Sequence, residues 1–219
     1  MTNDQVKSKQ RIVDHGEVFT SEREVNAMLD LVKQETERID SRFLEPACGT
    51  GNFLIEVLQR KLDVVTRRYA RNSIDWERYA LVAVANVYGI DLLWDNVDEC
   101  QKRLYAVFAR EYVHMFKGLC DKELERSIRH VLRKNIQCGD ALTMTTLDGH
   151  PIIFSEWSLM ELKVKRRDFT FDELLEANRS GQISIFQAAM AYDQDAQGFI
   201  PNPLKEYPLI HYRRVFEYE

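Results

Sequence analysis

Two glycines and three acidic residues stand where this sequence could bind a ligand and do chemistry. Gly49 and Gly51 form a Gly-x-Gly turn just after Glu45, and Asp91 and Asp140 each end a short segment that is predicted to be a β-strand. Ligands of open α/β sheets bind beyond the carboxyl ends of the strands. We therefore expect these five residues to converge on one ligand site.

The Gly-x-Gly turn does not fit the common nucleotide-binding motifs. A dinucleotide site needs glycine or alanine three residues after Gly51, where this chain has Leu54, and a P-loop needs Gly-Lys-Ser/Thr, which is absent. The turn carries no Lys or Arg for a phosphate, and its surroundings are acidic. This pattern favours a ligand with cationic groups and sugar hydroxyls.

S-adenosylmethionine (SAM) is such a ligand, because it carries an ammonium, a sulfonium and a ribose but no phosphate. Glycines in the turn let the backbone approach a cofactor without a Cβ clash. Asp91 is expected to accept from the ribose hydroxyls and Asp140 from the adenine amine. Leu92, Leu93 and Ala141 are expected to enclose the adenine ring. A ligand-free turn, and plain cap or turn roles for the two aspartates, are the alternatives.

Alternating helices and strands are predicted to position these residues. A capping box over 21–24 starts an amphipathic helix at 22–39. Further helices are expected at 54–69, at 75–86, after a cap at Asp95 or Asn96, and at 122–134, 171–179 and 183–192. Strands are expected at 43–44, 87–92, 135–140, 151–154 and 209–218. This alternation predicts an α/β fold with a mainly parallel sheet.

Composition bounds the class of protein. The chain has 219 residues, of which 45% are hydrophobic and 30% charged, and its formal net charge is -5. These values predict one domain, or one domain with a small appendage, and exclude disorder, coiled coil and collagen as the main structure. They also exclude a wholly basic nucleic-acid coat protein, although a local basic groove stays compatible with the net charge.

Signals for membrane insertion and metal binding are missing from the sequence. No apolar run approaches the roughly 20 residues of a membrane span, and the first residues are polar, so we expect a cytoplasmic protein that enters no membrane. The 4 cysteines and 5 histidines are scattered without Cys-x-x-Cys or His-Glu-x-x-His spacing. We therefore expect reduced cysteines and no metal site.

Four segments resemble motifs of the adenine-specific DNA methyltransferases of restriction-modification systems. Glu45–Leu54 resembles the first motif of that family almost letter for letter, and Gly16–Ser21 resembles the segment that closes over the methionine end of SAM. Gly89–Asp91 resembles the ribose motif and Cys138–Leu142 the adenine motif. The resemblance covers residues 11–154.

The resemblance implies a fold, a cofactor and a set of binding residues. The fold would be the Rossmann-like sheet of class I SAM-dependent methyltransferases. Its parts would be an N-terminal helical segment (1–40) that closes over the cofactor, a SAM-binding core (41–160), and a partly irregular C-terminal extension (161–219) that completes the sheet. The residues expected to bind SAM are Thr20, Glu45, Ala47, Gly49, Gly51, Asn52, Phe53, Asp91, Leu92, Asp140 and Ala141.

The catalytic motif of that family is missing from its usual place. The family has Asn or Asp, then Pro-Pro, then Tyr or Phe, after the fourth strand; these residues hold the amine of a flipped adenine and stack on its ring. This chain has Ser155-Glu156-Trp157 there. Glu156, as an acceptor from the amine, and Trp157, as a stacking platform, are the catalytic candidates, with core packing as the alternative for Trp157. The segment 202–204 (Asn-Pro-Leu) is a candidate for a displaced motif.

Basic clusters and chain length indicate the partners. Basic residues gather at 163–167 and 126–134, where either a DNA contact or a solvated face is expected. The residues after 154 are too few to complete a catalytic sheet and add a DNA-reading domain. DNA is therefore an expected partner, with its sequence read by a second methyltransferase or specificity subunit.

The sequence thus predicts an adenine-specific DNA methyltransferase, or the SAM-binding part of one, in a restriction-modification or related defence system. Three alternatives stay open. One is a catalytically silent SAM-binding subunit whose partner carries the catalytic tetrapeptide. Another is a methyltransferase that acts on RNA, protein or a small molecule. The last is an interaction module that binds no SAM.

Overall fold

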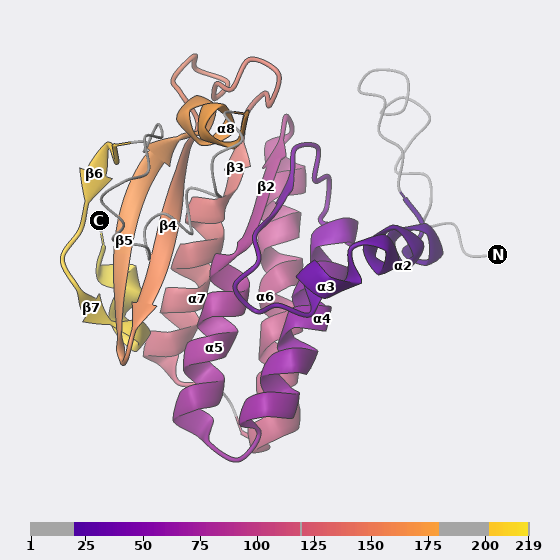
Figure 1. The fold of residues 1–219 in the computed structure, drawn as a ribbon, viewed down its shortest axis with the longest axis vertical. Helices are drawn as coiled ribbons and strands as arrows, with labels where there is room; N and C mark the ends of the chain where they lie inside the picture. Colours follow the sequence, from indigo (N-terminus) through magenta and orange to yellow (C-terminus); the bar gives the residue numbers. More distant parts are fainter. Residues whose placement is uncertain (1–19, 119, 180–201, 219) are drawn as a thin grey trace.

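A parallel sheet, long helices and an antiparallel hairpin make up an α/β fold (Figure 1). The computed structural model of the chain describes residues 20–118, 120–179 and 202–218. Residues on one face of the parallel sheet pack with the long helices, and those on the other face pack with the antiparallel strands and a short helix. The predicted α/β class is therefore confirmed at this level.

Three strands form the parallel sheet in the order β1-β2-β3. They are β1 (Phe43–Glu45), β2 (Val87–Asp91) and β3 (Ile136–Cys138). In the register, Glu45 pairs with Gly89 and Asp91 pairs with Cys138. Because the strands are parallel, their carboxyl ends meet at one edge of the sheet, as the sequence predicts.

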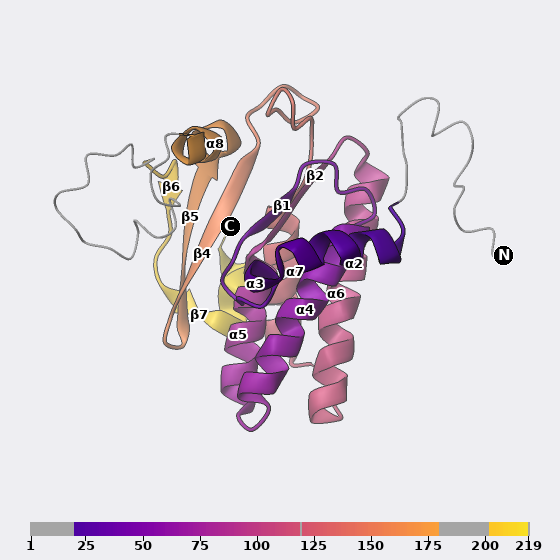
Figure 2. The ribbon, with the colours of Figure 1, turned by 45° about the vertical axis from the view of Figure 1, so that its right-hand side comes forward.

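Two helices follow each of the first two strands and run side by side (Figure 2). These helices are α4 (Asn52–Tyr69), α5 (Ser73–Ala85), α6 (Trp94–Phe116) and α7 (Lys122–Asn135). Apolar residues at helical spacing give each of them a face in one continuous core. Asn72 caps α5 and Asp121 caps α7, each through its side-chain oxygen. The expected cap of α6 at Asp95 or Asn96 is wrong, because both lie inside its first turn.

The remaining strands form a second sheet, which is antiparallel. Its strands are β4 (Ile153–Met160), β5 (Lys163–Thr170), β6 (Lys205–Glu206) and β7 (Ile210–His211). The prediction that a fourth strand near 151–154 joins the parallel sheet, and that 161–219 complete it, is therefore wrong for the described residues. The cause is local: only Glu161 and Leu162 separate β4 from β5, and so short a connection allows antiparallel pairing alone.

Other boundaries depart from the prediction. The capping box of Ser21 is present, but the first helix ends after ten residues as α2 (Glu22–Leu31), and Val32 (φ -117°, ψ 31°) separates it from α3 (Lys33–Thr36). Helix α8 (Phe171–Arg179) lies where it was predicted. The expected strand at 209–218 is wrong beyond β7, since η2 (Tyr212–Glu217) is a 3-10 helix. The expected helix at 183–192 lies outside the described residues.

A buried carboxylate attaches the C-terminal residues to the helical layer. Glu77 on α5 is 1% exposed and accepts hydrogen bonds from the hydroxyls of Tyr112 (3.1 Å) and Tyr212 (2.7 Å). It also accepts from Nε (2.8 Å) and Nη2 (2.6 Å) of Arg213. Four donors on one buried carboxylate satisfy its hydrogen-bonding capacity, so this cluster fixes η2 against α5 and α6.

Candidate functional site

The strand ends, the N-terminus of α6 and the helix α2 enclose a pocket of about 610 Å³. Every residue predicted to bind the cofactor lines this pocket except Gly51. They come from segments far apart in the chain: the turn after β1, the ends of β2 and β3, and Thr20 before α2. A volume of this size falls within the range of small-molecule and cofactor sites, about 300–1,000 Å³.

Positive φ angles and close packing explain both glycines of the turn between β1 and α4. Gly49 has φ +51°, and a Cβ added there would meet no atom within 4 Å, so its backbone faces open space. Gly51 has φ +89° and is the N-cap of α4; a Cβ there would lie 2.6 Å from Sγ of Cys100. Gly49 thus leaves room for a ligand, whereas Gly51 lets α6 pack beneath the turn.

Substituting Gly51→Val is expected to lower the free energy of unfolding by about 2–4 kcal/mol. A β-branched residue must adopt a left-handed conformation there and displace Cys100 from the core. Urea unfolding followed by circular dichroism measures the loss. The matched control is Gly118→Val, because Gly118 has no positive φ and its added Cβ would meet only one atom, at 3.8 Å. Equal stability of the two variants would contradict this account of the turn.

Asp91 joins the three strand ends through its carboxylate and its backbone carbonyl. Its Oδ1 accepts from the N–H of Leu93 (2.9 Å) and from Nδ2 of Asn96 (3.1 Å), and its Oδ2 accepts from the N–H of Gly49 (2.9 Å). The N–H of Gly139 donates to the Asp91 carbonyl (3.0 Å). A carboxylate has about four acceptor positions, so these bonds leave one, on Oδ2, for a ligand hydroxyl. This is less than the sequence predicts, which is acceptance from both ribose hydroxyls.

Asp140 and its neighbours form the far wall of the pocket. Oδ1 of Asp140 accepts from the N–H of Leu142 (2.8 Å), and its own N–H donates to the carbonyl of Thr145 (2.8 Å). Its second carboxylate oxygen keeps acceptor positions for a ligand. Ala141 and the half-exposed Leu92 add apolar surface to the same wall.

Carboxylates dominate the charge of the pocket. Glu45, Asp91 and Asp140 line it, and none of the described lining residues is Lys or Arg. Burial raises the pKa of the Glu45 carboxyl, an effect that a hydrogen bond from the backbone of Ala47 partly offsets. The pocket therefore suits a ligand with a cationic group, hydroxyls and an apolar ring, and disfavours a phosphate.

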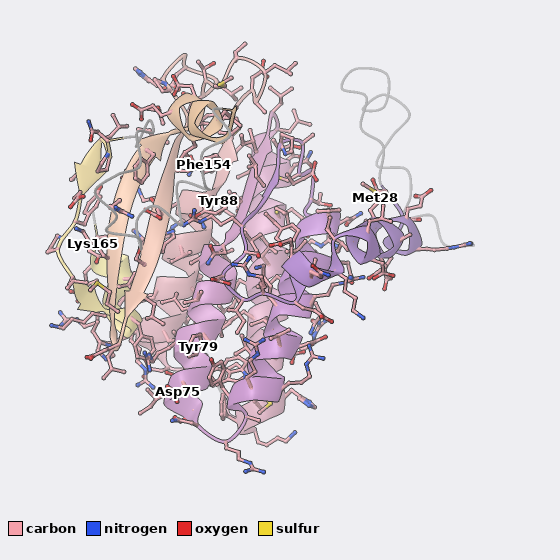
Figure 3. All side chains as sticks on the ribbon, viewed as in Figure 1. Met28, Asp75, Tyr79, Tyr88, Phe154 and Lys165 are labelled. Carbon is pink, nitrogen blue, oxygen red and sulfur yellow. The ribbon has the colours of Figure 1, made fainter. Side chains whose placement is uncertain are left out.

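Sequence reasoning missed the residues that hold the turn from below. Nη1 of Arg103 donates to the carbonyl (2.7 Å) and Oγ1 (2.9 Å) of Thr50 and to Oδ1 of Asn52 (2.8 Å). Asn96, Cys100 and Arg103 are spaced by four and three residues, which places them on one face of α6. That spacing was a signal for a shared helix face, but not for the position of that face beneath the turn. Met28 of α2 also lines the pocket, and Figure 3 shows its side chain on that helix.

The structure does not bring Glu156 and Trp157 to this pocket. Both lie inside β4 and are buried, at 4% and 8% exposure. Nη2 of Arg42 lies 2.9 Å from Oε1 of Glu156, and the indole N–H of Trp157 donates to Oδ1 of Asn135 (3.0 Å). Arg42 thus occupies an oxygen of Glu156, and the ring of Trp157 is packed in the core, so the catalytic roles predicted for them do not fit the geometry. The Asn-Pro-Leu segment lies beside β5 and does not line the pocket either.

The basic cluster after β4 does not form one surface. Successive residues of β5 alternate between its two faces. Arg166 is buried on Asp168 (2.7 Å), while Lys165 pairs with Glu206 (2.7 Å). On α7, Arg129 pairs with Glu125 at 3.0 Å. Arg166 is thus turned to the interior, and on the other face of β5 Lys165 and Arg167 are paired with Glu206 and Glu156.

Two searches within the described residues were negative. No group of three or more His, Cys, Asp and Glu residues there is arranged to hold a metal ion. No described helix is both long and apolar enough to cross a bilayer. Comparisons with protein-family models, with curated proteins and with solved structures found no match to this chain.

Proposed function

We propose that this chain binds SAM in the pocket at the strand ends, as a Rossmann-like protein of the class I methyltransferase type. The observation that carries the proposal is the convergence of three separate motifs on one cavity. Residues from the turn after β1, from Asp91 and from Asp140 all line it. The parallel sheet brings these strand ends together, and the cavity that they line carries three carboxylates and no described Lys or Arg, which supports a ligand with cationic groups.

The residues of the pocket match the parts of SAM. Asp91 would accept from a ribose hydroxyl through Oδ2, and Asp140 from the adenine amine. Leu92 and Ala141 would contact the ring, and the acidic end near Glu45 would attract the ammonium. The open space at Gly49 removes the side chain that would otherwise obstruct a ligand there.

The reaction we propose is transfer of a methyl group to the amine of an adenine in DNA. Bound SAM supplies an electrophilic methyl group, and the chain contributes by holding the donor in a fixed orientation inside a polar cradle. The hydrogen bonds of Arg103 and Asp91 stabilise the turn in advance, so little ordering is left for the binding step. In a restriction-modification or defence system this chain would act as the methyltransferase or as its SAM-binding subunit.

A second candidate is a silent SAM-binding subunit that works with a catalytic partner. The burial of Glu156 and Trp157 favours it, because the pocket then lacks the expected acceptor-binding residues. Under this proposal the partner supplies the residues that hold the target base.

Two measurements in series test these proposals. Titration calorimetry of the purified chain is expected to show saturable SAM binding; its absence would refute both proposals. Labelled methyl transfer from SAM to unmethylated DNA is then measured with the chain alone and with the product of the adjacent gene. Label on DNA from the chain alone supports the enzyme, and label only in the mixture supports the silent subunit. No label in either condition, with SAM bound, would refute the DNA reaction.

A further inference from the structure

The order of the strands gives the pocket at the strand ends a direction. The turn after β1, Asp91 at the end of β2 and Asp140 beyond β3 line it, and the sheet has the order β1-β2-β3. With SAM bound as proposed above, the adenine lies at Asp140 and the ribose at Asp91. The amino-acid part then lies at the turn after β1, beside Glu45. This end of the pocket must accept both an ammonium and a carboxylate.

The carboxylate of the amino-acid part meets no cationic side chain in the described lining of the pocket. None of the described lining residues is Lys or Arg. Glu45 suits the ammonium but repels the carboxylate, because like charges at close range are unfavourable. Neutral hydrogen-bond donors are therefore needed at the turn. Thr50 and Asn52 are the polar side chains of the turn that line the pocket.

Arg103 determines which atoms of the Asn52 side chain face the pocket. Its Nη1 lies 2.8 Å from Oδ1 of Asn52. A guanidinium only donates, so it holds the amide oxygen on its own side and leaves Nδ2 on the opposite side. Nδ2 donates to the carbonyl of Thr20 (3.4 Å), and its second hydrogen has no acceptor among the described residues. Thr20 and Asn52 both line the pocket, so this hydrogen can be donated to a ligand there.

The same guanidinium orients the hydroxyl of Thr50. Nη1 of Arg103 donates to Oγ1 (2.9 Å) and to the backbone carbonyl (2.7 Å) of this residue. Because Arg103 accepts no hydrogen bond, the hydroxyl must direct its own hydrogen elsewhere, and no described residue accepts it. Thr50 is 7% exposed, and its donor is strengthened because the hydroxyl already accepts from a cation. The hydroxyl of Thr50 is therefore a second donor for a ligand.

The first turn of α4 adds positive potential beside these two donors. The helix begins at Asn52, its N-cap Gly51 makes no side-chain hydrogen bond, and its first turn has no acidic residue. The N-terminus of a helix carries a partial positive charge. This part of the pocket therefore suits an anion, whereas the wall of Glu45, Asp91 and Asp140 suits a cationic group and hydroxyls.

We propose that Thr50 and Asn52 bind the carboxylate of the amino-acid part of SAM and that Arg103 is their positioning residue. This assignment rests on the proposed SAM binding and adds to it the groups that recognise the amino acid. Arg103 does not line the pocket, so it acts through the other two side chains by holding their donors toward the ligand. A carboxylate has about four acceptor positions and accommodates both donors.

Comparison of two ligands tests the assignment. Decarboxylated SAM keeps the adenine, ribose, sulfonium and ammonium and lacks only the carboxylate. Titration calorimetry of the full chain is expected to show that it binds at least about tenfold more weakly than SAM, because a hydrogen bond to a charged group contributes about this factor or more. Equal affinity for the two ligands would overturn the assignment and leave the proposed SAM site in place. Absence of SAM binding would refute the SAM site and the assignment with it.

Three variants test the roles of the two side chains through the ratio of the two dissociation constants. Asn52→Leu and Arg103→Met are each expected to weaken SAM about tenfold and to bring this ratio toward one. Arg103→Lys keeps a donating cation and is expected to keep most of the ratio. The control is Arg110→Gln, which removes an exposed guanidinium on α6 that donates to Gln59 (2.6 Å) and should bind both ligands as the wild type does.

The ratio separates positioning from mere support of the turn. A support alone would weaken both ligands by the same factor, so an unchanged ratio in folded Arg103→Met would overturn the positioning role. An unchanged ratio in Asn52→Leu would overturn the contact with the carboxylate, and this variant serves where Arg103→Met does not fold. Far-ultraviolet circular dichroism verifies the folding of each variant.

Discussion

Asp91→Ala is expected to weaken SAM binding by about 100-fold or more. The substitution removes the acceptor for a ribose hydroxyl, and a hydrogen bond to a charged group contributes about 1.5–3 kcal/mol. It also releases the N–H groups of Gly49 and Leu93, so the turn after β1 loses one of its hydrogen bonds to β2 and keeps the one from Cys48 to Ile90. Both effects act on the same pocket and add to the loss. Titration calorimetry of SAM measures it.

Control variants separate binding from folding in this experiment. Asp91→Asn keeps an acceptor oxygen without the charge and is expected to lie between alanine and wild type. Asp98→Ala removes an exposed carboxylate on α6 that pairs with Lys102. It should leave SAM affinity unchanged. Far-ultraviolet circular dichroism verifies that each variant is folded at the temperature of the titration. Wild-type affinity in folded Asp91→Ala would refute the assignment of this residue.

Glu77→Ala is expected to lower the free energy of unfolding by about 3–5 kcal/mol. The change leaves the hydroxyls of Tyr112 and Tyr212 in the interior without their shared acceptor, and it removes the partner of Arg213, whose side chain is 33% exposed. Each buried hydroxyl left without a partner costs about 1–3 kcal/mol, whereas water solvates the guanidinium. Urea unfolding measures the change, and the loosened attachment of η2 is expected to appear as faster amide exchange there.

Two further variants define the origin of that effect. Glu77→Gln keeps two acceptor positions but not the charge, so an intermediate loss is expected. Glu217→Ala removes an exposed carboxylate that pairs with Arg214 within the same 3-10 helix, and it should change stability by less than about 1 kcal/mol. If Glu77→Ala lowers the free energy of unfolding by less than about 1 kcal/mol, the cluster contributes little to the attachment of η2.

The parallel half of the fold could be predicted because its signals are local. Between β1 and β3 one pattern repeats: a short apolar segment, a turn or an acidic residue, and then a helix with a period of 3.6 residues. Each such unit has one stable arrangement. The fourth strand could not be placed in this way. Ile153–Met160 is apolar enough for either sheet, and pairing with Lys163–Thr170 is decided by the tight turn at Glu161, which was not recognised as a hairpin.

The residues of the candidate site also divide into those that the sequence could predict and those that it could not. Gly49, Asp91 and Asp140 could be placed because strand ends are predictable positions for ligand contacts. Arg103 was missed because its role depends on how α6 lies beneath the turn, a tertiary relation that helical spacing alone does not determine. The catalytic roles predicted for Glu156 and Trp157 do not fit the structure for a related reason. They were assigned from a slot in a sequence motif, whereas the direction and pairing of β4 decide what these side chains contact.

The edges of the two sheets have a consequence for aggregation. β1 and β3 are the outer strands of the parallel sheet in the described part of the chain, and each has three residues. Strands this short present few unpaired backbone groups as a template for another copy. β4 is a longer edge, but its residues 154–157 are buried, and the hydroxyl of Tyr88 donates to the carbonyl of Ser155. We therefore expect strand length and packing to limit intermolecular β-pairing at these edges.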